Sequence, residues 1–82
     1  MQDERIQRVE RDEVRSDHTV LELLITEDRL WSFEEVVREL GERFVVEDAV
    51  ARLHGAGLIH RFESFVFATR AAMRAWQLSE VG

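Results

Sequence analysis

Residues 52–62 read RLHGAGLIHRF, and within them the hydrophobic pattern changes from a helical period to the alternation of a strand. Upstream of Gly57, apolar residues recur at i, i+3, i+4 and i+7, which predicts a helix over residues 46–56. These residues are Val46, Ala49, Val50 and Leu53. Gly57 can adopt the left-handed conformation that ends a helix, and Leu58 can then pack back on the last turn. The stretch is therefore predicted to join a helix to a strand.

The residues after this junction predict a hairpin and a last helix. Two short runs of aromatic and branched residues, LIHRF at 58–62 and FVFA at 65–68, are separated only by Glu63 and Ser64. This pattern is typical of two antiparallel strands, although the turn is neither Asn-Gly nor Asp-Gly and its type stays open. Thr69 can cap a helix that ends near Leu78. We expect Met73 and Trp76 of that helix to cover the core.

The residues before the junction predict two further helices. In WSFEEVVRELG, residues 31–41, Ser32 and Glu35 form a capping box, and Gly41 stands where the helix should stop. An earlier apolar stripe predicts a helix over residues 18–26, which Ser16 or Asp17 could cap.

The length and composition indicate a single domain. A chain of 82 residues is too short for two independent cores, and 45% of it is hydrophobic. We assign residues 18–82 to the domain. Residues 1–17 are strongly charged and form either a tail or a helix that orders on a partner. The predicted fold class is mainly α with a small β-hairpin.

The order of these elements, together with RLHGAGLIHRF, FVFAT and WSFEEVVRELG, resembles the winged helix-turn-helix superfamily of prokaryotic transcription regulators. The resemblance covers residues 18–70. It implies a three-helix core, a two-stranded wing at 58–68 and a C-terminal helix. It also implies that helix 46–56 lies in the major groove of double-stranded DNA, and that the protein is a dimeric DNA-binding regulator.

Carried over by position, the resemblance makes Arg52 the reader of bases and makes Arg43 and Arg61 clamps on the phosphate backbone. Arg70 and Ser64 complete the candidate DNA-binding set. The chain departs from the family pattern where Glu47 and Asp48 open the predicted recognition helix, since carboxylates repel phosphate. We interpret these two acids as first-turn residues that complement the helix dipole.

A second interpretation therefore stays open, in which the domain is a protein–protein interaction module that does not bind DNA. The net charge of −6 favours it. Apolar residues of the terminal segments are the candidates for an interface with a protein partner or a second copy. They are Ile6, Val9, Val14, Met73, Trp76 and Leu78.

Several classes of function are not expected. The chain has no cysteine and no glycine-rich phosphate loop, and its three histidines match no compact ligand motif. We therefore expect no metal, no cofactor and no enzymatic activity. With no apolar run long enough for a bilayer and a charged N-terminus, the chain is expected to be cytoplasmic and not bound to a membrane.

Overall fold

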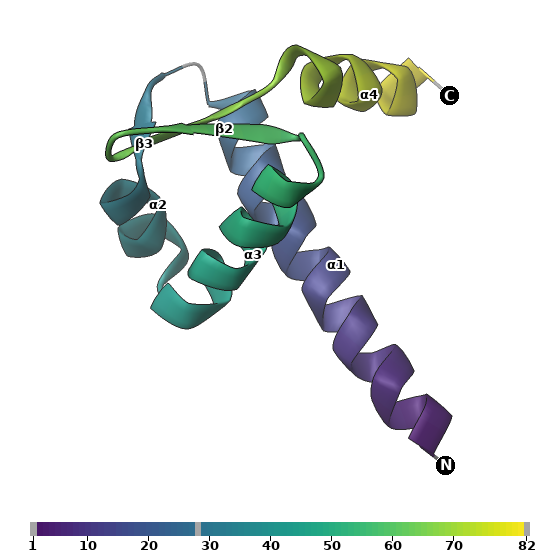
Figure 1. Cartoon of the computed structure of the whole chain (residues 1–82). Coiled ribbons are helices and arrows are strands. Elements are labelled where there is room, and N and C mark those ends of the chain that lie inside the picture. The colour runs from purple at the N-terminus through teal and green to yellow at the C-terminus, as the bar shows by residue number, and fades with distance from the viewer. Residues whose placement is uncertain (1, 28, 82) are drawn as a thin grey trace.

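The computed structural model describes the backbone of residues 2–27 and 29–81, and the side chains of residues 8–27 and 29–80. The chain is mainly helical with a small antiparallel sheet, as the coarse fold class predicts (Figure 1). Its elements follow in the order α1 (Gln2–Thr26), β1 (Trp31–Ser32), α2 (Phe33–Leu40), α3 (Arg43–Gly55), β2 (Ile59–Phe62), β3 (Phe65–Ala68) and α4 (Arg70–Val81). None of the helices in the described part of the chain combines the length and apolarity needed to cross a membrane.

The core lies between the second half of α1, helices α2 and α3, and the inner face of the sheet. The apolar stripe predicted for α3 is confirmed, because Val46, Ala49, Val50 and Leu53 are all buried. Helix α1 adds Val20 and Leu24 to the same cluster. The remaining buried members are Trp31, Val36, Ile59 and Val66.

The sheet has three strands, not the two that the sequence predicts. Strand β3 lies in the middle and pairs with β2 on one side and with β1 on the other. The third strand was missed because it contains only two residues, Trp31 and Ser32, which the sequence analysis assigned to the start of the following helix. This pairing holds the beginning of α2 against the hairpin.

Helix α2 begins and ends as predicted. The Glu35 backbone N–H donates to Ser32 Oγ at 3.1 Å, and the Ser32 N–H donates to Glu35 Oε1 at 2.9 Å, which completes the capping box. Gly41 ends the helix with φ at 89°, in the left-handed region.

Helix α3 ends as predicted but begins three residues earlier. At its end, the Leu58 N–H donates to the Leu53 carbonyl and the Gly57 N–H donates to the His54 carbonyl, which is a Schellman motif. At its start, the Val46 N–H already donates to the Glu42 carbonyl. The left-handed Gly41 turns the chain so sharply that α3 can start at Arg43.

This earlier start overturns the interpretation of Glu47 and Asp48 as first-turn acids. The first turn contains no acidic residue, and both carboxylates lie in the second turn, where the effect of the helix dipole is weaker. Both residues are exposed. The dipole therefore does not explain why they are there.

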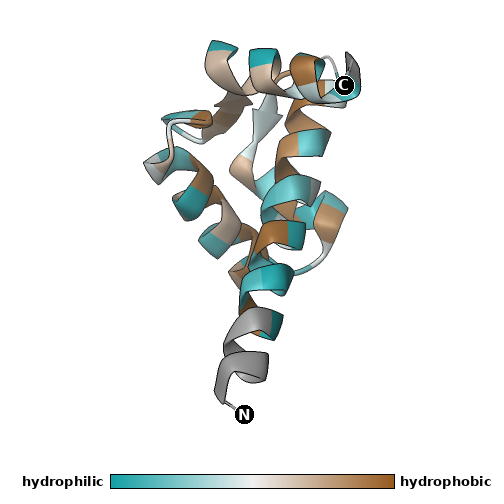
Figure 2. Ribbon diagram, turned by 90° about the vertical axis from the view of Figure 1, so that its right-hand side faces the viewer, coloured by the Kyte–Doolittle hydropathy of each residue, from teal (hydrophilic) through white to brown (hydrophobic). Residues whose placement is uncertain are grey.

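Helix α1 is much longer than residues 18–26, so the expected cap at Ser16 or Asp17 is wrong. The helix passes through both positions without interruption. Ser16 Oγ instead donates to the Asp12 carbonyl, and Asp17 binds a side chain of α3. The first turns of α1 extend beyond the other elements (Figure 1), whereas its second half, which carries both apolar and polar residues, packs on them (Figure 2).

Helix α4 starts at the predicted cap and lies at the opposite end of the molecule from the N-terminus (Figure 1). Thr69 Oγ1 accepts a hydrogen bond from the Ala72 N–H. Ala72 is buried, whereas Met73 is 45% exposed, so the expectation that Met73 covers the core is wrong. Trp76 is half-buried.

Candidate interaction surface

Arg52, the predicted reader of bases, is bound by two carboxylates of α1. Its Nε donates to both oxygens of Asp17, at 3.0 and 3.2 Å, and Glu13 lies 4.0 Å from its guanidinium. The hydrogen bond that Arg52 donates to Asp17 is the main cause that raises the pKa of Arg52. The side chain therefore neutralises an acidic stretch of α1 and is not presented as a free cation.

Arg43, one of the two predicted phosphate clamps, is bound in the same way. Its guanidinium donates to both carboxylate oxygens of Glu34, at 3.0 and 2.6 Å. This forked contact raises the pKa of Arg43 and lowers the pKa of Glu34. The pair joins the first turn of α3 to the first turn of α2.

The other three candidates for DNA contact lie on different elements. Arg61, on β2, places its guanidinium 6.0 Å from the centre of the Phe33 ring. Ser64 lies in the hairpin turn, where its carbonyl accepts a hydrogen bond from the Phe33 N–H. Arg70 opens α4 and is exposed. Within the described part of the chain, neither Arg61 nor Arg70 belongs to an ion pair.

The exposed face of α3 is instead apolar and acidic. Phe44 is 80% exposed, more than any other large hydrophobic side chain in the described residues, and Val45 beside it is 41% exposed. Exposed residues at i+3, i+4 and i+7 from Phe44 share its side of the helix. We call this surface the α3 face and define it as Phe44, Val45, Glu47, Asp48 and Ala51.

A groove borders the α3 face where the N-terminal half of α1 runs beside α3. Its volume is about 200 Å³, and Val9 of α1 and Val45 of α3 contribute its apolar part. Asp12, Glu13 and Asp48 add carboxylates, and Arg52 contributes the cation that is already paired. We call this hollow the α1/α3 groove.

The residues predicted to form a partner interface do not lie on one surface. Val9 and Val14 are 51% and 66% exposed on α1, but only Val9 lines the α1/α3 groove. Met73 and Leu78 are exposed on α4. The side chain of Ile6 lies outside the described residues.

The predicted start of the helix at residue 46 leaves Phe44 outside it, so the sequence did not indicate Phe44 as a surface residue of α3. The available signal was its position three residues after Gly41, because a helix that starts directly after the glycine turns Phe44 away from the buried Val46 stripe.

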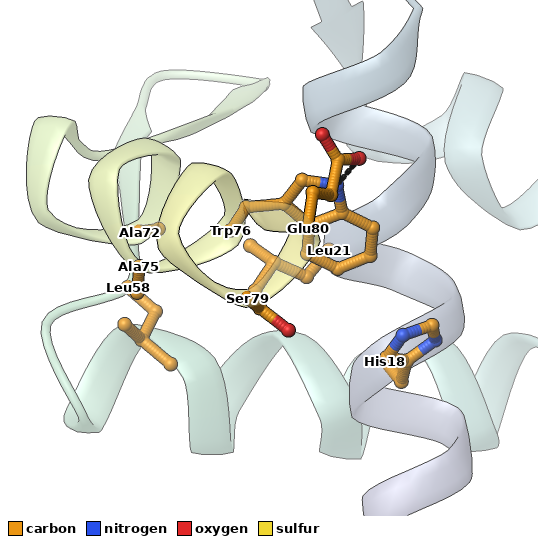
Figure 3. Close-up of a pocket in the computed structure, with 8 residues that line it drawn as sticks. All are labelled: His18, Leu21, Leu58, Ala72, Ala75, Trp76, Ser79 and Glu80. Atoms are coloured by element: carbon orange, nitrogen blue, oxygen red, sulfur yellow. Dashed lines mark hydrogen bonds between the residues drawn. The ribbon is translucent and has the colours of Figure 1, made fainter. Parts of the chain in front are cut away.

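A second hollow lies between α1 and α4 (Figure 3). His18 and Leu21 of α1 form one side of it, and Ala72, Ala75 and Trp76 of α4 form the other, with Leu58 at its base. Its volume is about 440 Å³. We call it the α1/α4 pocket.

The three histidines do not come together. His18 lies against Trp76, His60 lies against Phe67, and His54 is exposed near the end of α3. Among the described residues, no group of three or more histidine, aspartate or glutamate side chains is placed to hold a metal ion.

Comparison of the chain with protein-family models, with curated proteins and with solved structures finds no match.

Proposed function

We propose that the chain has a winged helix-turn-helix fold and works as a protein-interaction module through the α3 face. Three helices followed by a hairpin, with a Schellman motif between α3 and β2, support the winged helix. The module is cytoplasmic in this proposal, and its partner is another protein or a second copy of the chain.

The 80% exposure of Phe44 carries the proposal. An exposed phenylalanine on a rigid helix can fill a pocket of a partner, and aromatic anchors of this kind contribute much of the energy of protein interfaces. Glu47 and Asp48 beside it favour a partner whose apolar pocket has a basic rim. The partner would cover a surface that DNA would be expected to avoid.

The internal ion pairs support the same assignment. A phosphate group would have to compete with Asp17 for Arg52 and with Glu34 for Arg43. Breaking either pair would leave a carboxylate next to the DNA backbone. The predicted base reader and one of the two predicted phosphate clamps are thus used to hold helices together.

Photo-crosslinking from position 44 tests the proposal. We would replace Phe44 by p-benzoylphenylalanine, irradiate cells that express the variant, and identify adducts by mass spectrometry. Gln77, exposed on α4, is the matched control position. We expect protein adducts from position 44. An excess of the wild-type chain, added as a competitor, should suppress these adducts, whereas an excess of the Phe44→Ser variant should not. The same adducts from both positions, or none from position 44, would contradict the proposal.

DNA binding is the second candidate function, and the exposed Arg61 and Arg70 favour it. Two phosphate contacts per chain would give a slope of about −2 for log K against log salt. Fluorescence anisotropy with a pool of random duplexes measures this slope. If the wild-type chain binds and Arg61→Ala binds more weakly with a shallower slope, DNA is a ligand. If the wild-type chain does not bind DNA at low salt, protein interaction is the function that is left.

A further inference from the structure

The α1/α4 pocket has the features of a small-molecule site and is separate from the α3 face. Its volume of about 440 Å³ lies within the range of about 300–1000 Å³ that is usual for ligand pockets. Its walls are mainly aliphatic, from Leu21, Leu58, Ala72 and Ala75, and its few polar groups lie on α1 and on the last turns of α4. None of these residues lines the α1/α3 groove.

The pocket contains two aromatic rings, one from α1 and one from α4, which lie against each other. The rings of His18 and Trp76 have their centres 5.0 Å apart and are tilted by 36°. The Trp76 Nε1–H donates to Glu80 Oε1 at 2.9 Å, a contact drawn as a dashed line in Figure 3. On the other side, His18 Nδ1 lies 3.5 Å from Glu22 Oε2. The indole therefore has a defined orientation at the pocket.

The charge around the pocket is negative. Glu80 lines it, no arginine is among the described residues that line it, and the whole chain carries a net charge of −6. A carboxylate beside an indole attracts a cation twice, because the ring face and the carboxylate oxygens are both negative. An anionic ligand would be repelled by Glu80, and a neutral one would gain only from the aliphatic walls.

From this combination we propose that the α1/α4 pocket binds a small organic cation with an aromatic or branched apolar body, of the arylalkylammonium class. The apolar body lies against Leu21, Leu58 and Ala72. The ammonium group lies near Trp76 and Glu80. Since the ligand touches both α1 and α4, its binding also stabilises α4 on the rest of the domain.

Titration of the ¹⁵N-labelled chain with 2-phenylethylammonium, followed by NMR, tests the proposal. The Trp76 indole N–H reports on the pocket directly, and the indole N–H of Trp31, buried in the core, serves as an internal reference. We expect saturable shifts of the Trp76 signal and of residues in α1 and α4. The neutral 2-phenylethanol should bind about fivefold more weakly, and the anionic 3-phenylpropanoate weaker still.

Two variants connect the binding to the named side chains. Glu80→Gln keeps an acceptor for the indole N–H but removes the charge, so the preference for the cation over the alcohol should shrink to the part that the Trp76 ring contributes. Trp76→Leu should abolish the binding of the cation, whereas Leu78→Ala, at an exposed position of the same helix, should leave it unchanged. Circular dichroism would verify that each variant is folded.

The proposal is overturned if the Trp76 signal of the wild-type chain does not shift saturably with 2-phenylethylammonium. It is also overturned if the cation, the alcohol and the acid bind equally well, or if Glu80→Gln leaves the preference for the cation as large as in the wild-type chain.

Discussion

The Arg52 guanidinium on α3 donates to both carboxylate oxygens of Asp17 on α1, 35 positions earlier in the chain. The two side chains are 33% and 24% exposed, so water screens the pair only in part. The contact joins the middle of the long first helix to the helix that was expected to read DNA.

We predict that this pair stabilises the fold measurably. In a double-mutant cycle of Asp17→Ala and Arg52→Ala, the coupling free energy should be about 1 kcal/mol, because the contact is forked and partly buried. Urea unfolding of the four proteins measures it, and the coupling should shrink at high salt.

The matched control for this cycle is Asp12→Ala, an exposed position on the same helix whose side chain is not bonded to Arg52. Its effect should add to that of Arg52→Ala without coupling. If the effects of Asp17→Ala and Arg52→Ala on the free energy of unfolding also add without coupling, the pair does not hold α1 to α3.

The capping box of α2 leads to a prediction about pH. The Ser32 N–H and the Arg29 guanidinium both donate to the Glu35 carboxylate and hold the pKa of Glu35 below its usual value of 4.5. A carboxyl whose pKa is lower in the folded state stabilises the fold above its unfolded pKa. Its contribution is lost as the pH falls from about 4.5 through the lower folded value.

Glu35→Gln separates this contribution from the rest of the acid response. Glutamine can still accept the Ser32 N–H but carries no charge. The free energy of unfolding of wild type should therefore fall more steeply than that of Glu35→Gln between pH 5 and pH 3, an interval chosen to bracket the usual glutamate pKa. Parallel curves for the two proteins would show that Glu35 is not the titrating group.

The hairpin turn contains a residue in an unfavourable backbone conformation. Glu63 has φ at 54°, in the left-handed region that glycine adopts without a steric penalty. We predict that Glu63→Gly raises the free energy of unfolding, by up to about 1 kcal/mol. Ser64→Gly is the control, since the φ of Ser64 is not positive, and it should destabilise the hairpin. Thermal unfolding that ranks the two variants in the opposite order would contradict this account.

The features that the sequence predicts correctly are decided within a few residues. The capping box needs Ser32 and Glu35, and the Schellman motif needs Gly57 and Leu58 after an apolar stripe. Both satisfy backbone groups that a helix end leaves free, so their chemistry is readable from neighbouring positions. The hairpin is similar, because two residues connect its strands.

The features that were missed depend on partners far away in the chain. The sequence pattern gives no partner for the Arg52 cation. Only the fold brings Asp17 beside it. Strand β1 exists because β3 offers it a free edge, where Val66 pairs with Trp31, 35 residues earlier in the chain. The early start of α3 follows from the geometry of Gly41, and this start exposes Phe44. The exposure of Phe44 could thus be inferred from neighbouring positions, whereas the pairing of Arg52 and the third strand could not.

Thr69, which follows the hairpin, connects the end of α3 to the last helix through one hydroxyl group. Its Oγ1 accepts a hydrogen bond from the Ala72 N–H at 3.1 Å and donates to the Gly57 carbonyl at 2.9 Å. The residue is 7% exposed, so water cannot easily replace either bond.

Thr69→Val, which keeps the shape of the side chain, should therefore lower the free energy of unfolding by about 1–2 kcal/mol. Thr69→Ser keeps the hydroxyl and should lower the free energy of unfolding much less. Hydrogen exchange would locate the effect, because the amides of α4 should lose protection before those of the α1–α3 core. Equal destabilisation by valine and serine would mean that packing of the methyl group, and not the two hydrogen bonds, holds α4 in place.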